Sequence, residues 1–442
     1  MLTRGLVCRL HGARTSRVFV ARKVTPQLLS GEKRGARWVS GDPKAGTSWV
    51  SSHFREWSRD RTPFATWTMS DLGVSSQVIP QDEDARLLAS WSIDANYRGH
   101  IPADPSLTGA PPRLELKNIG RSIQRDKLIS KEAITPLKAA RNTVERIFHS
   151  AVKHRSPDLD PQTIDFFSYL GTVKRNMIFG SNPVLIVASR GQPLMILNFM
   201  LPGTGRSTDT KYLGTAFEIA LTQDDHNIPR PSTHQRVIGE RFGHLSLALQ
   251  YEVDARVTSA TTTRSEETLH NAQLDGLETS STTQSAGIGP ELDAPPNPII
   301  YINHSAAEVE PVEIKTYSPR TRATRLKDLV SSSWFTRIKK ACVGVVGKDH
   351  NIRIHMVDLA QLRKKHSDRY QLRFQRLHAL LLKLKAVIPR DRAGAYVLCP
   401  LDVQVDFKDR KWELYEADMD DPLVKWRFDR LNTFPEKDSQ PV

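Results

Sequence analysis

The sequence predicts an α/β protein in which a mixed β-sheet is flanked by helices. Several short segments alternate apolar and polar residues, as strands do, and longer segments repeat apolar residues at spacings of three and four, as helices do. With 442 residues, 39% of them hydrophobic, the chain can bury a large core. No apolar run approaches the roughly 20 residues that span a bilayer, so we expect no membrane partner. Three cysteines without a CxxC motif argue against a disulfide framework and a zinc site.

The chain is basic, with 63 Lys and Arg against 49 Asp and Glu and a net charge of +14. Such a charge favours polyanionic partners such as nucleic acid. Residues 1–40 hold seven Arg and two Lys against one acid, which is typical of an organelle presequence. The alternatives are a disordered basic tail or an extension before a start at Met69. We therefore expect residues 1–68 to be a basic tail or presequence. Without residues 1–40, 54 basic and 48 acidic residues leave a charge of +6.

Residues 91–132 hold Pro, Gly and short apolar groups, and we expect them to wrap the surface of the core that follows. Apolar residues at helical spacing predict a helix that ends at Ser156-Pro157. Residues 183–189 and 193–198 predict two strands joined by a short turn. The clearest strand is 245–254, where the odd-numbered positions are apolar. Its period of two places Glu252 and Asp254 on the opposite face, about 7 Å apart.

The second half of the chain repeats this mixture after a break. Residues 255–298 are rich in Ser and Thr and predict a solvated, disordered insertion. Further elements are then expected: strands at 299–302, 311–316, 341–346 and 396–405, and helices at 326–340 and 374–388. The catalytic domain is thus expected as a first part, residues 91–254, and a second part, residues 299–430.

Two strand segments place acids and a lysine at alternating positions. Glu252-Val-Asp254 and Glu313-Ile-Lys315 each keep one apolar residue between two charged ones. If the two strands are neighbours, three carboxylates and an ammonium converge on one face. Carboxylates this close repel each other unless a cation joins them, and oxygen ligands suit Mg²⁺ or Mn²⁺. This composition favours metal-assisted phosphodiester or pyrophosphate hydrolysis, with Lys315 at the phosphate.

Each triplet is also common by itself. Charged residues that alternate with apolar ones ordinarily form the solvated face of a sheet. The two triplets alone therefore leave a purely structural interpretation open.

The order of the motifs resembles the DXO family of decapping and exoribonuclease proteins, in its fungal type, which act on RNA 5′ ends. Arg241 to Asp254 is similar to the family's ExD strand, and Val312 to Thr316 to its ExK strand. Gly214 to Glu218, preceded by Tyr212, resembles the GYKFE motif. Asp165 to Gly171 resembles the WRG segment, and Leu326 to Gly344 aligns without gaps to the later helix and strand. The resemblance covers roughly residues 130–350 and extends more weakly to about 420.

The resemblance implies a PD-(D/E)xK nuclease-like core with one or two Mg²⁺ or Mn²⁺ ions. The implied metal ligands are Glu218, Glu252, Asp254 and Glu313, and the implied catalytic residues are Lys315 and Glu252. Leu170 stands where the family has an arginine, and Ser332 where it has a glutamine. RNA or phosphate contacts are expected from Lys174, Arg175, Arg320, Arg322 and Ser332.

Two functions follow from this resemblance. The first is a metal-dependent hydrolase of RNA 5′ ends that removes incomplete or NAD-type caps, with 5′–3′ exoribonuclease activity as a further expectation. The alternative is a catalytically weakened RNA-binding or partner-stabilising pseudoenzyme on the same fold. The implied partners are RNA 5′ ends and a 5′–3′ exoribonuclease protein. The implied location is the nucleus or cytoplasm, and the basic N-terminus gives mitochondria as the alternative.

Overall fold

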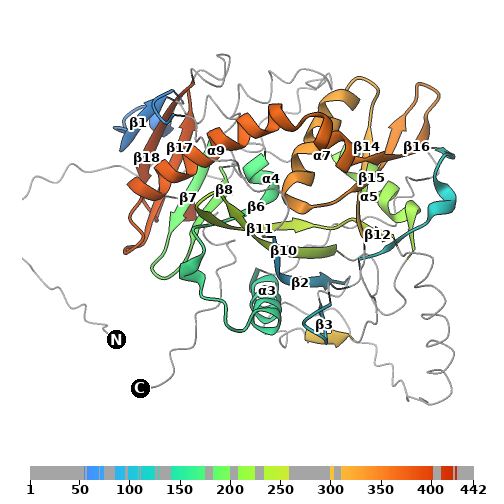
Figure 1. The fold of residues 1–442 in the computed structure, drawn as a ribbon, viewed down its shortest axis with the longest axis horizontal. Coiled ribbons are helices and arrows are strands. Elements are labelled where there is room, and N and C mark those ends of the chain that lie inside the picture. Colours follow the sequence, from blue (N-terminus) through green and yellow to red (C-terminus); the bar gives the residue numbers. More distant parts are fainter. Residues whose placement is uncertain are drawn as a thin grey trace, which may run out of the picture. The chain divides into compact units, whose positions relative to one another are not determined.

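Figure 1 shows the fold of the chain in a computed structural model. The structure describes residues 54, 57–68, 70–73, 85–94, 98–107, 109, 111–124, 128, 141–174, 183–199, 208–223, 233–257, 299–302, 310–401, 410–421 and 424–425. The presequence expected in residues 1–40, Arg175 and most of the expected insertion lie outside these residues.

Within the described part of the chain, eleven strands form the larger of two sheets. Their bounds are β1 Ala65–Thr68, β2 Arg86–Ile93, β3 Gly99–Pro102, β6 Phe166–Tyr169, β7 Val184–Ala188, β8 Leu194–Asn198, β10 Thr233–Phe242, β11 Leu245–Glu252, β13 Ile299–Ile302, β17 Gly394–Pro400 and β18 Lys411–Ala417. The strand order is β1-β18-β17-β7-β8-β6-β11-β10-β2-β3-β13. The sheet is mixed, because β6 runs parallel to β8 and β11 while β10 and β11 form an antiparallel hairpin.

The smaller sheet has seven strands among the described residues, in the order β5-β16-β15-β14-β12-β4-β9. Their bounds are β4 Arg113–Leu114, β5 Ser122–Gln124, β9 Thr222–Gln223, β12 Ala255–Val257, β14 Glu310–Tyr317, β15 Lys340–Val346 and β16 Asn351–Asp358. Strands β14 and β15 are parallel, and helix α7 (Arg322–Thr336) makes the crossover between them that parallel neighbours require.

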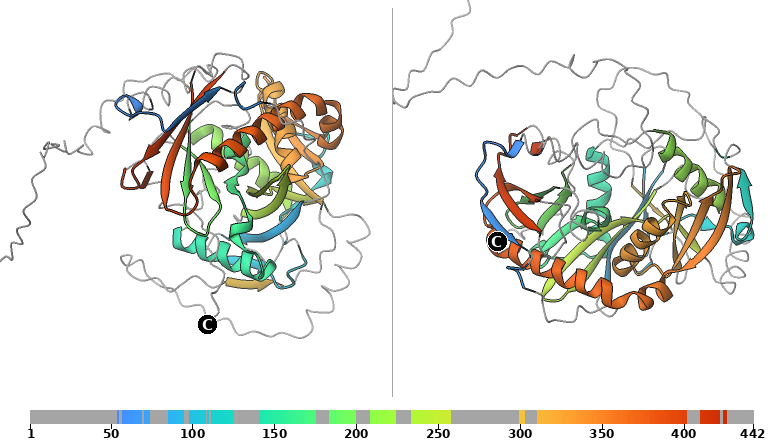
Figure 2. Two further views of the ribbon diagram at one scale, coloured as in Figure 1. Left: turned by 60° about the vertical axis from the view of Figure 1, so that its left-hand side comes forward. Right: turned by 90° about the horizontal axis from the view of Figure 1, so that it is seen from above.

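Helices cover both faces of the larger sheet. Besides α7, the helices in the described ranges are α3 Arg141–Arg155, α4 Leu170–Thr172, α5 Thr208–Leu221, α8 Leu359–Lys365 and α9 Ser367–Val387, with 3₁₀ turns at Leu116–Asn118 and Pro161–Thr163. Helix α9 packs Leu377 and Leu381 into the same core cluster as Leu247 and Leu249 of β11. Helix α3 lies on the other face, as Figures 1 and 2 show, and belongs to the cluster that contains Ala248. None of the described helices is long and apolar enough to cross a membrane.

The predicted class, an α/β protein with mixed sheet flanked by helices, is confirmed, but the strands divide between two sheets. We predicted that the even-numbered residues of the 245–254 strand form a solvated polar face, and this prediction is wrong for Ala248 and Gln250. Ala248 is fully buried and Gln250 is 5% exposed, because α3 and its neighbours cover the face that we expected to be open. On this face Ser246 is partly exposed, and Glu252, the last residue of β11, is exposed.

Two predicted boundaries differ from the structure. Order begins before residue 68: Phe54 is buried, Trp57 donates from Nε1 to Asp421 Oδ2 at 2.9 Å, and β1 pairs with β18. Phe54 and Trp67 of this segment are buried in the core, which its basic composition does not predict. Residues 255–257 form β12 and so belong to the smaller sheet rather than to the insertion.

Several other predicted elements are confirmed. Strands β7 and β8 form the expected antiparallel pair around Arg190 to Gln192, and α3 ends immediately before Ser156. On β14, Val312 and Ile314 are fully buried while Glu313 and Lys315 keep partial exposure, as the alternation predicts. The predicted helix at 326–340 is α7, which ends earlier because Arg337 adopts a left-handed conformation (φ 60°).

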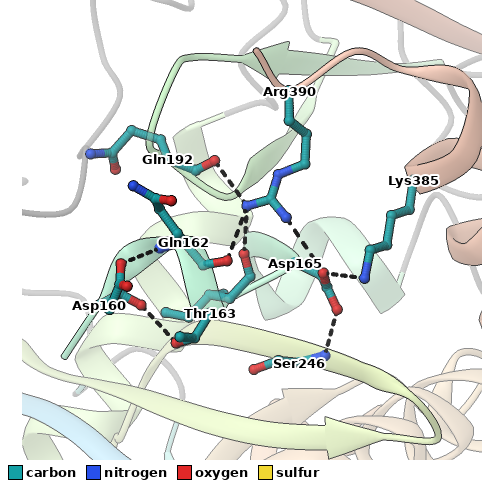
Figure 3. Close-up of polar contacts among 9 residues, drawn as sticks. Asp160, Gln162, Thr163, Asp165, Gln192, Ser246, Lys385 and Arg390 are labelled. Carbon is teal, nitrogen blue, oxygen red and sulfur yellow. Dashed lines mark hydrogen bonds and ion pairs between the residues drawn. The ribbon is translucent and has the colours of Figure 1, made fainter.

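A buried carboxylate ties the end of α9 to the middle of the larger sheet (Figure 3). Asp165 is 7% exposed and accepts a hydrogen bond from the Ser246 backbone N–H at 3.0 Å. Its Oδ1 also forms an ion pair with Lys385 Nζ at 2.6 Å. Arg390 Nη1 approaches the same carboxylate at 3.5 Å. Arg390 also donates from Nη2 to the carbonyl oxygens of Ile164 (3.1 Å) and Gln192 (3.3 Å). One acid thus joins β11, the start of β6 and the segment after α9.

We expect Asp165→Asn to lower the free energy of unfolding by about 1–3 kcal/mol, because it removes the buried negative charge that pairs with Lys385 and Arg390. Chemical denaturation followed by circular dichroism measures this change. The matched control is Arg392→Gln, which breaks an exposed ion pair to Glu416 (3.6 Å) and should change stability by less than about 0.5 kcal/mol. Equal stability of Asp165→Asn and the wild type would contradict the assigned role.

Candidate active site

The ExD triplet lies where the chain passes from one sheet to the other. Strand β11 of the larger sheet ends at Glu252, and β12 of the smaller sheet begins at Ala255. The backbone N–H of Val253, between the two acids, donates to the carbonyl of His234 on β10 at 2.9 Å. Because Ala255 pairs with Val312 of β14, Asp254 comes to lie beside Glu313. The expected juxtaposition of the ExD and ExK segments is thus present, through β12 rather than β11.

Lys315 lies between two of the acids. Its Nζ is 2.6 Å from Asp254 Oδ2 and 2.9 Å from Glu313 Oε1. Asp254 Oδ2 also accepts the backbone N–H of Ile314 at 2.8 Å, which fixes the carboxylate against β14. The Asp254 side chain is 4% exposed, whereas Lys315 is 38% exposed. The ammonium group therefore neutralises a buried acid from one side and can reach a ligand from the other.

Glu218 joins this cluster from the last turn of α5. Burial and the negative charges of Asp254, Glu252 and Glu313, opposed by Lys315, together raise the pKa of Glu218 to about 9. Glu218 is thus within electrostatic reach of the other three acids. The helix turn itself is held by Thr222, whose hydroxyl donates to the Glu218 carbonyl at 2.7 Å.

The cluster holds more negative charge than its lysine neutralises. Burial raises the pKa of Asp254 to about 7, with Lys315 opposing and the neighbouring glutamates reinforcing the rise. Desolvation also raises the pKa of Glu252, although its side chain reaches solvent at the edge of the cluster. Burial works against the charge of Lys315, but Asp254 and Glu313 outweigh it and hold the pKa well above its usual value. The Lys315 ammonium thus remains charged, whereas the raised pKa values of the acids favour their protonated forms.

A divalent cation fits this donor set by its chemistry. Carboxylate oxygens are the ligands of Mg²⁺ and Mn²⁺, and the raised pKa values of Glu218 and Asp254 reflect burial and mutual repulsion that Lys315 only partly offsets. As the side chains stand, no three Asp, Glu, His or Cys residues of the described ranges are arranged to hold a metal ion. Two of the acids are bound instead to Lys315.

Two of the predicted phosphate-binding residues contact each other. Lys174, directly after α4, donates from Nζ to the Ser332 hydroxyl at 2.8 Å. Ser332 in turn donates to the Asp328 carbonyl one turn earlier on α7, at 3.0 Å. Leu170, which replaces the arginine of the resembled family, is 7% exposed and packs in the core. Lys174 therefore provides a cation one turn after the position of the missing arginine.

The other predicted phosphate-binding residues do not enter the cluster in the described structure. Arg320 and Arg322 are exposed on the turn between β14 and the start of α7. Arg175 lies outside the described residues.

The sequence reasoning missed one polar residue of this region, Tyr317. It stands two positions after Lys315 on β14, so the same alternation that selected Glu313 and Lys315 places it on their face. Its side chain is 5% exposed, and its hydroxyl has no hydrogen-bond partner among the described residues.

Comparison with family models matches residues 204–420 to a domain of unknown function (DUF8563). This range contains every acid of the cluster and Lys315. A search of curated proteins finds no match.

Solved structures of similar fold include Rai1 proteins from fungi. S. pombe Rai1 in complex with 3′-FADP superposes with a TM-score of 0.53 at 11% identity, covering 80% of this chain and 99% of that one. Scheffersomyces stipitis Rai1 with (3′-NADP)⁺ and calcium gives 0.53 at 12% identity, covering 82% and 96%. Candida albicans Rai1 with pU5 and Mn²⁺ gives 0.52 at 14% identity, covering 84% and 99%. Identities this low establish the fold alone, and the prediction of a fungal-type DXO fold is confirmed.

Proposed function

Because the chain has the fold of the fungal Rai1 proteins, we propose that it is a metal-dependent hydrolase of RNA 5′ ends, active on caps, on NAD-type ends or on terminal nucleotides. One observation carries this proposal: Asp254 and Glu313 bind one lysine at the junction of the two sheets, and Glu218 and Glu252 interact electrostatically with the same lysine. The Candida albicans structure of this fold holds an oligonucleotide with Mn²⁺, and the Scheffersomyces stipitis structure a dinucleotide with calcium. These are the classes of ligand that the proposed reaction requires.

The cluster divides the work among its residues. The proposed ligands of one or two Mg²⁺ or Mn²⁺ ions are Glu218, Glu252, Asp254 and Glu313. A bound ion would supply Lewis-acid activation of water and neutralise charge on the phosphate. Lys315 contributes a permanent positive charge next to the phosphorus, where negative charge builds up in the transition state. Glu252, at the solvent edge and with a raised pKa, is suited to take the proton of the attacking water.

The nearby cations would hold the rest of the RNA. Lys174 is fixed by its hydrogen bond to Ser332 and would contact a phosphate in place of the family's arginine. Arg320 and Arg322, on the exposed turn, would follow the backbone without reading its sequence, and Arg175 is proposed for the same role. A 5′–3′ exoribonuclease partner and a nuclear or cytoplasmic location stay predictions.

The test uses the full-length protein with Mn²⁺ or Mg²⁺ and four end-labelled RNAs. The RNAs carry a 5′ monophosphate, a triphosphate, an unmethylated cap or an NAD cap. We expect hydrolysis of at least one end, reduced by about 10³-fold or more in an Asp254→Ala, Glu313→Ala double variant. The exposed acid Glu416 provides the control, because Glu416→Ala should leave the rate unchanged.

Thermal unfolding of each variant separates lost chemistry from a lost fold. If wild type and double variant bind RNA equally and neither cleaves any end, the hydrolase proposal fails. The weakened pseudoenzyme on the same fold would then be the better description, consistent with the core position of Leu170.

A further inference from the structure

The hydroxyl of Tyr317 is buried without a hydrogen-bond partner in the described part of the chain. Tyr317 lies on β14, four residues after Glu313 and two after Lys315, so the three side chains project from one face of the strand. Its ring belongs to the core cluster that contains Leu329 of α7 and Val253. Because an unpaired buried hydroxyl costs free energy, native proteins rarely retain one that serves no purpose. An unpaired hydroxyl on the same strand face as Glu313 and Lys315 therefore points to a ligand at this site.

The strand places the phenol beside the site, because Tyr317 follows Lys315 on the same face of β14 and its ring packs in the core cluster that includes Leu329 of α7. Burial raises the pKa of Tyr317, which Lys315 opposes and Glu313 reinforces. Asp328 and Arg325 of α7, an ion pair of 3.8 Å, also act on the pKa of this phenol. With its pKa raised, it remains protonated at physiological pH and can always donate.

We propose that the Tyr317 hydroxyl donates a hydrogen bond to a phosphate oxygen of the RNA 5′ end, beside the oxygen that Lys315 contacts. This inference rests on the proposed function and names one further substrate contact for it. The two acids that act on this phenol already have partners, Glu313 in Lys315 and Asp328 in Arg325, so the acceptor has to come with the ligand. An ionised phosphate suits this position because its oxygens accept hydrogen bonds and its charge matches the lysine.

Two other buried tyrosines provide matched controls. Tyr370 on α9 is 3% exposed, and its hydroxyl donates to the Lys327 carbonyl at 2.9 Å. Tyr396 on β17 is fully buried and, like Tyr317, has no partner for its hydroxyl among the described residues. Replacing each by phenylalanine removes one oxygen from a buried ring. The three variants thus separate a substrate contact from a structural bond and from a merely unpaired group.

The experiment measures binding by fluorescence anisotropy with Ca²⁺ present, using full-length protein and two pentauridylates that differ only in a 5′ phosphate or a 5′ hydroxyl. Wild type should prefer the phosphorylated RNA. Tyr317→Phe should lower that preference roughly tenfold or more, the effect of one hydrogen bond to a charged group, and leave binding of the 5′-hydroxyl RNA unchanged. Tyr370→Phe and Tyr396→Phe should keep the wild-type preference.

Thermal unfolding of the free proteins adds the second readout. Tyr317→Phe and Tyr396→Phe should melt at or above the wild-type temperature, because each loses an unpaired buried hydroxyl, and Tyr370→Phe should melt below it. The inference is overturned if Tyr317→Phe keeps the full phosphate preference or melts lower, as Tyr370→Phe does. If wild type itself shows no preference for the 5′ phosphate, both this inference and 5′-end recognition by the proposed enzyme are contradicted.

Discussion

Lys315→Met is expected to slow hydrolysis of the RNA 5′ end by about 10²–10³-fold without unfolding the protein. The substitution nearly keeps the length of the side chain and removes the ammonium group that lies within 2.9 Å of both Asp254 and Glu313. The positive charge that would face the phosphate in the transition state is then absent. The measurement is the single-turnover rate at saturating enzyme on the end that the wild type cleaves.

A lysine in a similar ion pair elsewhere provides the control for this variant. Lys411 Nζ lies 3.0 Å from Glu413 Oε1 on β18, and Lys411→Met should leave the rate unchanged. A second readout separates chemistry from folding: because Lys315 competes with a cation for Asp254 and Glu313, Lys315→Met should bind Mn²⁺ at least as tightly as wild type. A wild-type rate in Lys315→Met would remove the lysine from the mechanism, and loss of Mn²⁺ binding would mean that the site had collapsed.

The charged residues of β14 in this site could be predicted from the sequence, because the alternation of apolar and charged residues along the strand shows which side chains share a face. On β14, a period of two separates buried Val312 and Ile314 from the charged positions, and the structure keeps that separation. Alternation predicts that the ExD triplet lies on one continuous strand, whereas the chain changes sheets between Glu252 and Ala255. Periodicity is the same on both sides of such a junction, so it cannot show where one sheet ends and another begins.

The contacts between distant segments could not be predicted. Nothing in the sequence couples Lys174 to Ser332, or Asp165 to Lys385 and Arg390, since these pairs are more than 150 residues apart and depend on how helices pack on the sheet. The packing of Phe54 and β1 into the fold could not be predicted for a similar reason. The composition of this segment is that of a basic tail, and only packing against β18 and its neighbours reveals the burial of its aromatic side chains.

Without a metal ion, the protein is expected to lose stability as the pH rises from about 5 to 9. The pKa of Asp254 is raised to about 7 and that of Glu218 to about 9, so the folded state retains protons that the unfolded chain releases above pH 4–5. Stability from a raised pKa is fully present below the unfolded value and is lost as the pH passes through the folded value. The expected loss is on the order of a few kcal/mol, measured by denaturation in EDTA at several pH values.

Added Mn²⁺ should reverse this trend, because a divalent ion binds the deprotonated carboxylates. The rise in melting temperature on adding Mn²⁺ is therefore expected to increase from pH 6 to pH 8. Glu218→Gln tests the assignment, because an amide in place of the acid removes the largest raised pKa and one proposed ligand. This variant should flatten the pH dependence in EDTA and weaken the Mn²⁺ effect at pH 8, whereas Glu416→Gln should change neither. If Mn²⁺ stabilised Glu218→Gln and wild type equally at both pH values, Glu218 would be a buried structural acid. The metal would then have to be bound by Glu252, Asp254 and Glu313 alone.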